Sequence, residues 1–367
     1  MQLSTVRLSS RRSLFTYLPV YLYFSERYGL NSNILEVRDL RVHYNTRQGA
    51  VRAVNGVSFD LRAGERLGLV GESGSGKSTA ALALMRLIRP PGKIEGGQVL
   101  LDGLSLLELP DEQMRKIRLA EIALVSQGAM NSLNPVTRVR RQIEDALRDH
   151  DVKLTTRERA EWIGELLQRV GLPRNAADMY PHELSGGMKQ RACIAIAICL
   201  KPKVIIADEP TSALDVVVQH QVMETLENIR AELGASVILI GHDMGLMAQA
   251  VDRIGVMYAG DLIETGDIET LFDEPLHPYT RLLMASLPSL ERKEAARGIP
   301  GLMPSLLNKP KGCPFHPRCP EAFDRCKVDE PKLQTVRSKR DVACHLYSAN
   351  STQINLTEAN STSREAA

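Results

Sequence analysis

Residues 66–79 read RLGLVGESGSGKST, a short apolar run followed by a glycine-rich loop and the first turn of an expected helix. The loop matches the pattern G-x-x-x-x-G-K-[ST], in which glycines let successive backbone N–H groups turn inward around phosphates. The helix that follows adds the positive end of its dipole. In this pattern Lys77 reaches the terminal phosphates and the Ser78 hydroxyl binds Mg²⁺. The predicted phosphate-binding residues are Gly71, Ser73, Gly74, Ser75, Gly76, Lys77, Ser78 and Thr79.

The segments around this loop predict an α/β fold with a parallel sheet. Two further short runs, Val204–Ala207 and Val237–Ile240, are apolar throughout and rich in β-branched residues, as in strands covered on both faces. Residues 33–62 alternate apolar and polar positions, which predicts an antiparallel β layer. Residues 133–170 have helical spacing, and residues 254–264 are expected to form a hairpin. The loop therefore belongs to one strand–loop–helix unit of a layered domain.

A pair of acidic residues ends the expected strand at residues 204–208. Parallel α/β sheets bind ligands at the carboxyl ends of their strands, so both carboxylates are expected at the site. Asp208 suits the Mg²⁺ shell, and Glu209 is then placed to orient or deprotonate an attacking water. The alternative is an ordinary solvated turn, which a strand this apolar does not favour.

A second glycine-rich stretch, LSGGMKQ at residues 184–190, precedes a long apolar helix. Ser185 can cap that helix, and the two glycines expose backbone N–H groups that can receive a phosphate. Taken alone, the stretch is also compatible with a plain helix start. Its position about twenty residues before the Asp208 strand favours the phosphate interpretation.

Together these motifs resemble those of the nucleotide-binding subunits of ABC transporters, over about residues 34–266. In that family the loop above is Walker A, residues 184–190 are the signature, and residues 204–208 are Walker B with Glu209 as the catalytic acid. The signature has Met188 where many members have glutamine. The remaining motifs in the family's order are the adenine-stacking aromatic Tyr44, the Q-loop residue Gln127, the D-loop ending at Asp215, and the switch histidine His242.

The resemblance implies a mechanism in which two cassettes pair head to tail around ATP. The Walker A loop of one cassette and Ser185 and Gly187 of the other would enclose the nucleotide, with Asp215 nearby. Gln127 would sense the terminal phosphate and complete the Mg²⁺ shell, and His242 would contact that phosphate. The implied partners are two transmembrane permease subunits, a second identical or homologous ATPase subunit and, indirectly, an extracytoplasmic solute-binding protein. The chain would lie peripherally on the cytoplasmic face of the inner membrane.

The segment EPLHPYTRLL, from Glu274, resembles the H-P-Y segment of oligopeptide and dipeptide importer ATPases, to which nickel importers are close relatives. The resemblance implies uptake of peptides. The alternatives are nickel uptake, or an ABC ATPase that moves no solute, such as a repair or translation factor. Those factors tend to have two cassettes or a long coiled-coil insertion, whereas this chain has one cassette. A catalytically dead relative is disfavoured by the presence of Lys77, Glu209 and His242.

Six cysteines fall into two groups. Cys193 and Cys199 lie in an expected apolar helix and are predicted to be small core residues. Four others, Cys313, Cys319, Cys326 and Cys344, are numerous enough for one closed metal site. The C-x2-C pairing usual for zinc is absent, and four cysteines suit a [4Fe–4S] cluster, which similar peptide-importer subunits are understood to hold at this position. Zinc, unligated thiols and disulfides remain alternatives, and His316 and His345 are close enough in sequence to act as substitute ligands.

The composition and the two ends of the sequence restrict which partners, membrane segments and domains are expected. Of the 367 residues, 46 are basic and 44 acidic, so no strong positive field for nucleic acid is expected. The apolar run Leu14–Phe24 is too short to span a bilayer. It is interpreted as a secretory signal, a membrane-surface segment, or a disordered or mis-started extension. The predicted domains are an extension over 1–32, an ABC ATPase domain over 33–268 with a helical subdomain at about 130–195, a four-cysteine C-terminal domain over 269–347, and a disordered tail over 348–367.

Overall fold

The computed structural model describes residues 32–128, 132–286 and 298–347. The predicted tail and all of the predicted extension except Ser32 lie outside the described residues. Among the described residues, no helix has both the length and the apolar character needed to cross a bilayer.

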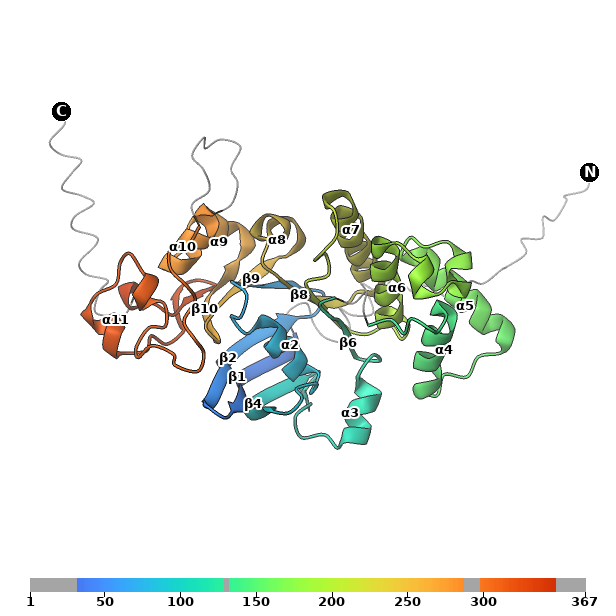
Figure 1. Ribbon diagram of the computed structural model, residues 1–367, viewed down its shortest axis with the longest axis horizontal. Coiled ribbons are helices and arrows are strands. Elements are labelled where there is room, and N and C mark those ends of the chain that lie inside the picture. Colours follow the sequence, from blue (N-terminus) through green and yellow to red (C-terminus); the bar gives the residue numbers. More distant parts are fainter. Residues whose placement is uncertain (1–31, 129–131, 287–297, 348–367) are drawn as a thin grey trace, which may run out of the picture.

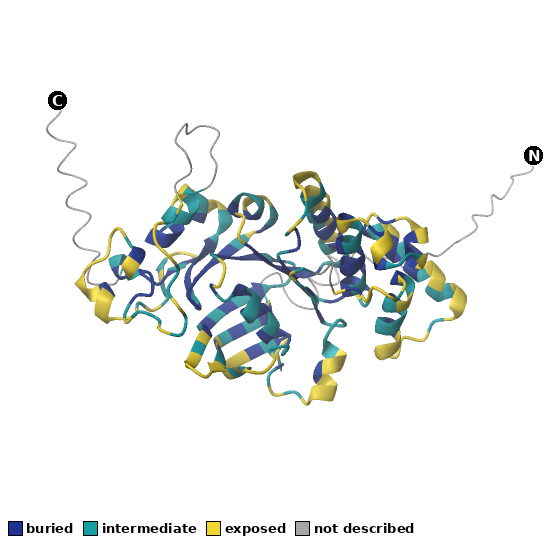
Figure 2. Ribbon diagram, in the orientation of Figure 1, coloured by how far each residue is buried: buried dark blue, intermediate teal, exposed yellow. Residues whose placement is uncertain are grey.

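An eight-stranded sheet with the order β11-β12-β10-β9-β3-β8-β7-β6 runs through the centre of the molecule (Figure 1). Its five neighbouring strands from β9 to β6 are parallel, which confirms the predicted parallel sheet. Every residue of β7 and β8 is buried, and Figure 2 shows these strands as part of the buried centre. The parallel strands are β3 (Arg66–Val70), β6 (Ile122–Val125), β7 (Val204–Asp208), β8 (Ser236–Gly241) and β9 (Arg253–Tyr258).

A second, four-stranded sheet with the order β2-β1-β4-β5 confirms the predicted antiparallel layer. Its apolar face shares one core with the main sheet and with α2, because Val37, Val54, Leu69 and Leu84 belong to the same buried cluster. The elements of this layer are β1 (Asn33–Thr46), β2 (Gly49–Arg62), β4 (Gly92–Leu101), β5 (Leu104–Ser105), α2 (Lys77–Leu84) and α3 (Asp111–Ile117).

A helical lobe lies beyond β6, at the right of Figure 1. Thr155 and Glu158 form a reciprocal capping box that starts one of its helices, as the pattern T-x-x-E predicts. Ile143, Ile163 and Ile194 hold its helices together in a buried core. The helices are α4 (Val139–Asp149), α5 (Thr156–Arg169) and α6 (Gly186–Ile198), with short 3-10 turns at Arg174–Asp178 and Pro181–Glu183. Two more helices flank the main sheet, α7 (Val216–Leu233) and α8 (Met244–Ala250).

The chain after β10 extends the main sheet, so a separate cysteine-rich C-terminal domain is not supported. Strand β12 pairs antiparallel with β10, and β11 pairs with β12. Cys313, Phe315 and Cys326 belong to the same buried core as Val256 of β9. The cysteine segment is too short and too polar to bury a core alone, so it packs on the sheet edge. The elements are β10 (Asp261–Asp267), α9 (Ile268–Asp273), α10 (Pro278–Ala285), α11 (Asp324–Val328), β11 (Gln334–Arg337) and β12 (Arg340–Val342), with 3-10 turns at His316–Arg318 and His345–Tyr347.

Candidate functional site

The phosphate loop joins β3 to α2, and two of its glycines are required by close backbone contacts. Gly71 has φ +148° and Gly76 has φ +104°, both in the region that favours glycine. A Cβ on Gly71 would lie 2.2 Å from the carbonyl oxygen of Met257, and one on Gly76 would lie 2.2 Å from that of Ala53. The tight turn that presents the backbone N–H groups therefore depends on these two positions.

Lys77, at the start of α2, folds back over its own loop. Its Nζ donates to the carbonyl oxygens of Gly71 at 2.8 Å and Glu72 at 2.9 Å, and to Ser75 Oγ at 3.2 Å. Burial lowers the pKa of Lys77, while the nearby carboxylates of Glu209 and Asp208 act in the opposite direction. A terminal phosphate would offer this buried ammonium group stronger acceptors than the loop carbonyls do.

Asp208 ends β7 and meets the first turn of α2. The Ser78 hydroxyl donates to Asp208 Oδ1 over 3.0 Å, although 130 positions separate the two residues. Burial raises the pKa of the Asp208 carboxyl, and the hydrogen bond from Ser78 opposes that shift. A hydroxyl and a carboxylate this close are oxygen ligands of the kind that Mg²⁺ prefers.

Glu209 follows Asp208 with a left-handed backbone, φ +46°. Gln127 Nε2 donates to Glu209 Oε2 at 2.7 Å, and His242 Nδ1 lies 3.5 Å from Glu209 Oε1. Gln127 follows β6, Glu209 follows β7 and His242 follows β8, which are adjacent parallel strands. The structure therefore brings three of the predicted site residues together at the carboxyl edge of the sheet, where such folds bind ligands.

Four predicted nucleotide-binding residues lie outside the phosphate loop and the Glu209 cluster: Tyr44, Ser185, Gly187 and Asp215. Tyr44, on β1, lines an open pocket with Leu82 and Pro91. Ser185 caps α6 by accepting from the Met188 N–H at 3.3 Å, and Asp215 caps α7 by accepting from the Val218 N–H at 3.0 Å.

Gly187 packs tightly against α7, because a Cβ on it would lie 2.5 Å from Val218 Cγ1. Figure 1 shows α6 in the lobe formed with α4 and α5, apart from α2. Ser185 and Gly187 are therefore not gathered onto the phosphate loop of their own chain.

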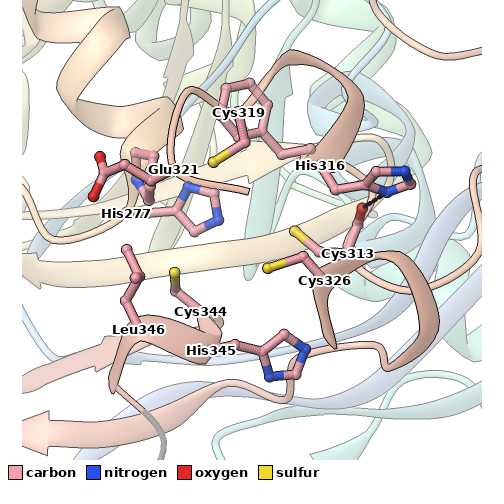
Figure 3. Close-up of a pocket in the computed structure, with 11 residues that line it drawn as sticks. His277, Cys313, His316, Cys319, Glu321, Cys326, Cys344, His345 and Leu346 are labelled. Carbon is pink, nitrogen blue, oxygen red and sulfur yellow. Dashed lines mark hydrogen bonds between the residues drawn. The ribbon is translucent and has the colours of Figure 1, made fainter. Parts of the chain in front are cut away.

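A second site lies in the C-terminal part of the chain, where four thiols face one pocket (Figure 3). Burial raises the pKa of Cys313 to about 11 and that of Cys344 to about 12. Thiolates at these positions would therefore need a bound cation to stabilise them. Within the described ranges, no group of three or more His, Cys, Asp or Glu side chains is arranged to hold a metal ion. The cysteines that line the pocket are Cys313, Cys319, Cys326 and Cys344.

Each of the three histidines around this pocket has a backbone partner; His277 Nδ1 accepts from the Tyr279 N–H at 3.0 Å. His316 Nδ1 contacts the Cys313 carbonyl oxygen at 2.9 Å, and His345 Nε2 contacts the Asp329 carbonyl oxygen at 2.8 Å, so both rings have backbone partners. His277, from the H-P-Y segment, lines the pocket and is only 1% exposed. Sequence reasoning missed His277 as a pocket residue, although it begins the segment that carried the family resemblance.

The main sheet, the phosphate loop and the acid pair at its edge define the class, an ATP-binding cassette ATPase. The family model described as "ABC transporter" matches residues 54–212, and the one described as "Oligopeptide/dipeptide transporter, C-terminal region" matches residues 263–326. The dipeptide transport ATP-binding protein DppD of Escherichia coli (strain K12) is 43% identical over 317 residues, covering 85% of this chain and 96% of that protein. DppD of Caldanaerobacter subterraneus subsp. tengcongensis is 42% identical over 86% of this chain and 98% of its own length.

A solved structure titled as the dimeric, post-hydrolysis ATP-binding cassette MJ0796 bound to ADP and Pi has a TM-score of 0.58 and 27% identity. It covers 64% of this chain and 98% of its own chain. The chain belongs to the family of ATP-binding proteins of oligopeptide and dipeptide ABC transporters. As a member of that family it is an ATPase.

Proposed function

We propose that this chain supplies the ATP hydrolysis for an importer of dipeptides or oligopeptides. Two observations support the proposal: the Gln127–Glu209–His242 cluster at the sheet edge, and the match of residues 263–326 to the peptide-transporter C-terminal region. The relatives named DppD are dipeptide transport proteins. A nickel importer is the second candidate, and the non-transport ABC ATPases are disfavoured by the same C-terminal match.

At the ATP site, each side chain has a proposed role. The amides of the phosphate loop and Lys77 bind the phosphates, and Tyr44 stacks on adenine. Ser78, Asp208 and Gln127 would hold Mg²⁺, which would neutralise charge on the transferred phosphoryl group and the leaving ADP. Glu209 orients and deprotonates the attacking water. Gln127 and His242 both contact the Glu209 carboxylate, so Gln127 holds it in place and His242 assists it.

A complete site is proposed to need two cassettes. Ser185 and Gly187 lie at the N-terminus of α6, whose backbone amides would receive the phosphate bound by the partner's loop. Asp215 would line the same interface. The similar cassette MJ0796 was solved as a dimer, which supports the pairing of two cassettes; the proposed pair is head to tail, of identical or homologous subunits.

The remaining partners follow from this arrangement. Two transmembrane permease subunits would carry the solute, and an extracytoplasmic solute-binding protein would act indirectly through them. The chain would then work at the cytoplasmic face of the inner membrane. Nearly balanced charge, 46 basic against 44 acidic residues, gives no reason to add a nucleic acid to this set.

The four-cysteine pocket is proposed to hold a [4Fe–4S] cluster. Four cysteine side chains lining one pocket is the donor set such a cluster uses. The four thiols lack the paired C-x2-C spacing that is usual for zinc, which favours the cluster over a zinc ion. Its proposed role is structural, ordering the chain between Cys313 and Cys344.

Reconstitution tests the transport proposal. The full chain would be co-expressed with candidate permease pairs and a solute receptor, and uptake of labelled dipeptide, oligopeptide and Ni²⁺ measured in vesicles. ATP-dependent peptide uptake is expected. Uptake of Ni²⁺ alone would favour the second candidate, and ATP hydrolysis with no associated permease would favour a non-transport ATPase.

A further inference from the structure

The cysteine segment contacts the phosphate loop directly, through Glu72. Glu72 is the second residue of the loop, and all of its polar groups have partners in the described structure. Its backbone N–H donates to Tyr279 Oη at 2.9 Å, and its carbonyl oxygen accepts from Lys77 Nζ at 2.9 Å. Its carboxylate accepts from Arg318 Nη1 at 2.7 Å and Nη2 at 3.0 Å. One loop residue thus joins the phosphate-binding lysine to two residues from the C-terminal part of the chain.

Arg318 is buried, and its guanidinium group faces the Glu72 carboxylate. Its side chain is only 4% exposed, and its two-pronged bond to Glu72 has the geometry of a strong guanidinium–carboxylate pair. Arg318 Nε donates to the Pro300 carbonyl oxygen at 2.8 Å, and Nη1 also reaches Tyr258 Oη at 3.3 Å. A buried guanidinium held on every side has little freedom to leave its carboxylate.

Tyr279 belongs to the H-P-Y segment and is fully buried. Its ring centroid lies 4.7 Å from that of Tyr258 and 5.4 Å from that of Phe315, and Tyr258 and Phe315 are 5.2 Å apart. Phe315 lies between Cys313 and Cys319 in sequence and shares the cysteine pocket. The rings therefore form a rigid connection from that pocket to the loop backbone.

We infer that Arg318 and Tyr279 are positioning residues that fix the phosphate loop through Glu72 and neutralise its carboxylate beside the bound nucleotide. A carboxylate in this loop would repel the phosphates of ATP unless a cation compensated it. Arg318, in the cysteine segment, supplies that cation. The Tyr279 hydroxyl accepts from the backbone N–H of Glu72, the residue after Gly71. The inference rests on the proposed use of this loop for ATP, and it gives the C-terminal segment a role in nucleotide affinity.

Charge removal in a double-mutant cycle tests the electrostatic part. ATP affinity of the full-length chain would be measured by isothermal titration for Arg318→Gln, Glu72→Gln and the double variant. Arg318→Gln is expected to weaken ATP binding about tenfold, because Glu72 is left unpaired beside the phosphates. The double variant removes that carboxylate as well and should return to within about threefold of wild type. Arg318→Lys keeps the charge without the two-pronged geometry and should lie between the two.

The Tyr279→Phe variant tests the backbone part with little change in packing. It removes only the hydroxyl that accepts from Glu72 N–H, and ATP binding should weaken about threefold to tenfold. Tyr347→Phe is the matched control, because its hydroxyl bonds the Leu276 carbonyl oxygen away from the loop. Arg337→Gln, which breaks the exposed pair with Glu274, is the matched arginine control. Both controls should keep wild-type affinity.

The possible results distinguish a failure of this inference from a failure of the proposed ATP site. Wild-type protein that binds no ATP, or binds it equally well after Lys77→Ala, would overturn the proposed site. Wild-type binding that Arg318→Gln and Tyr279→Phe leave unchanged would overturn the inference alone. If the affinity loss in Arg318→Gln merely tracks lost thermal stability and the double variant is no tighter, Arg318 has only a structural role and the inference fails.

Discussion

The side-chain amide nitrogen of Gln127 lies 2.7 Å from Oε2 of Glu209, although 82 positions separate the two residues in sequence. The other carboxylate oxygen of Glu209 faces His242 Nδ1 at 3.5 Å. Both neighbours come from strand ends adjacent to that of Glu209, so the sheet itself sets the direction of this carboxylate. The carboxylate of a general base needs such fixed orientation before its proton affinity matters.

Glu209→Gln is expected to slow ATP turnover severely while leaving ATP binding intact. The glutamine side-chain oxygen can still accept from Gln127, so the geometry is kept and only the base is lost. The hydrolysis rate should fall about 10²- to 10⁴-fold, with the dissociation constant for ATP within a few-fold of wild type. Phosphate release and nucleotide titration measure the two quantities. The control is Glu274→Gln, because Glu274 is exposed and pairs with Arg337. Hydrolysis by Glu209→Gln at the wild-type rate would remove Glu209 from the mechanism.

Ser78→Ala is expected to raise the Mg²⁺ concentration needed for half-maximal hydrolysis. The Ser78 hydroxyl is 3.0 Å from Asp208 Oδ1, so the variant loses one oxygen of the proposed ion site and the partner that orients the carboxylate. An increase of about 10- to 100-fold is expected from the loss of such a group. The measurement is ATPase rate against Mg²⁺ at fixed ATP, with Ser105→Ala in β5 as the control. An unchanged Mg²⁺ requirement would exclude Ser78 as a ligand.

Much of the fold could be predicted because short, continuous patterns determine it. The apolar runs of β7 and β8 have no polar face, which only a sheet covered on both sides allows. Residues 71–76 form the expected loop between β3 and α2, and residues 77–79 begin α2 as expected. The meeting of Gln127 with Glu209 follows once β6 and β7 are known to be parallel neighbours, because parallel strands share one carboxyl edge. Ser78 meets Asp208 at the same edge, although β8 lies between β3 and β7 in the sheet.

The C-terminal part could not be predicted in the same way. The pairing of β12 with β10 joins Val342 to Glu264, and nothing in a three-residue strand specifies that partner. The contact of Arg318 with Glu72 spans 246 positions and has no periodic signal. No sequence pattern links His277 to the cysteines; in the structure it caps α10 and lines the cysteine pocket.

Gly76→Ala is expected to destabilise the protein more than Gly64→Ala. Both glycines have positive φ, +104° and +74°, so each alanine carries backbone strain of about 1–3 kcal/mol. A Cβ at Gly76 also meets the Ala53 carbonyl oxygen at 2.2 Å, whereas nothing lies within 4 Å of one at Gly64. The extra overpacking should lower the free energy of unfolding by about 1–3 kcal/mol more, measured by denaturant titration. Equal losses of unfolding free energy in the two variants would show that the loop can move away from β2 at no energetic cost.

Cys344→Ser is expected to remove most of the iron from a protein purified under nitrogen. The wild-type chain should be brown, with about four iron and four sulfide per chain and a broad absorbance near the blue end of the visible range, as a [4Fe–4S] cluster requires. Cys199→Ser is the matched control, because Cys199 is also buried but lies at the end of α6 and not in the cysteine pocket. Iron, sulfide and zinc would be measured on all three proteins. A wild-type chain with about one zinc and no sulfide would replace the cluster by a zinc site; equal iron loss in both variants would show that Cys344 has no special place in it.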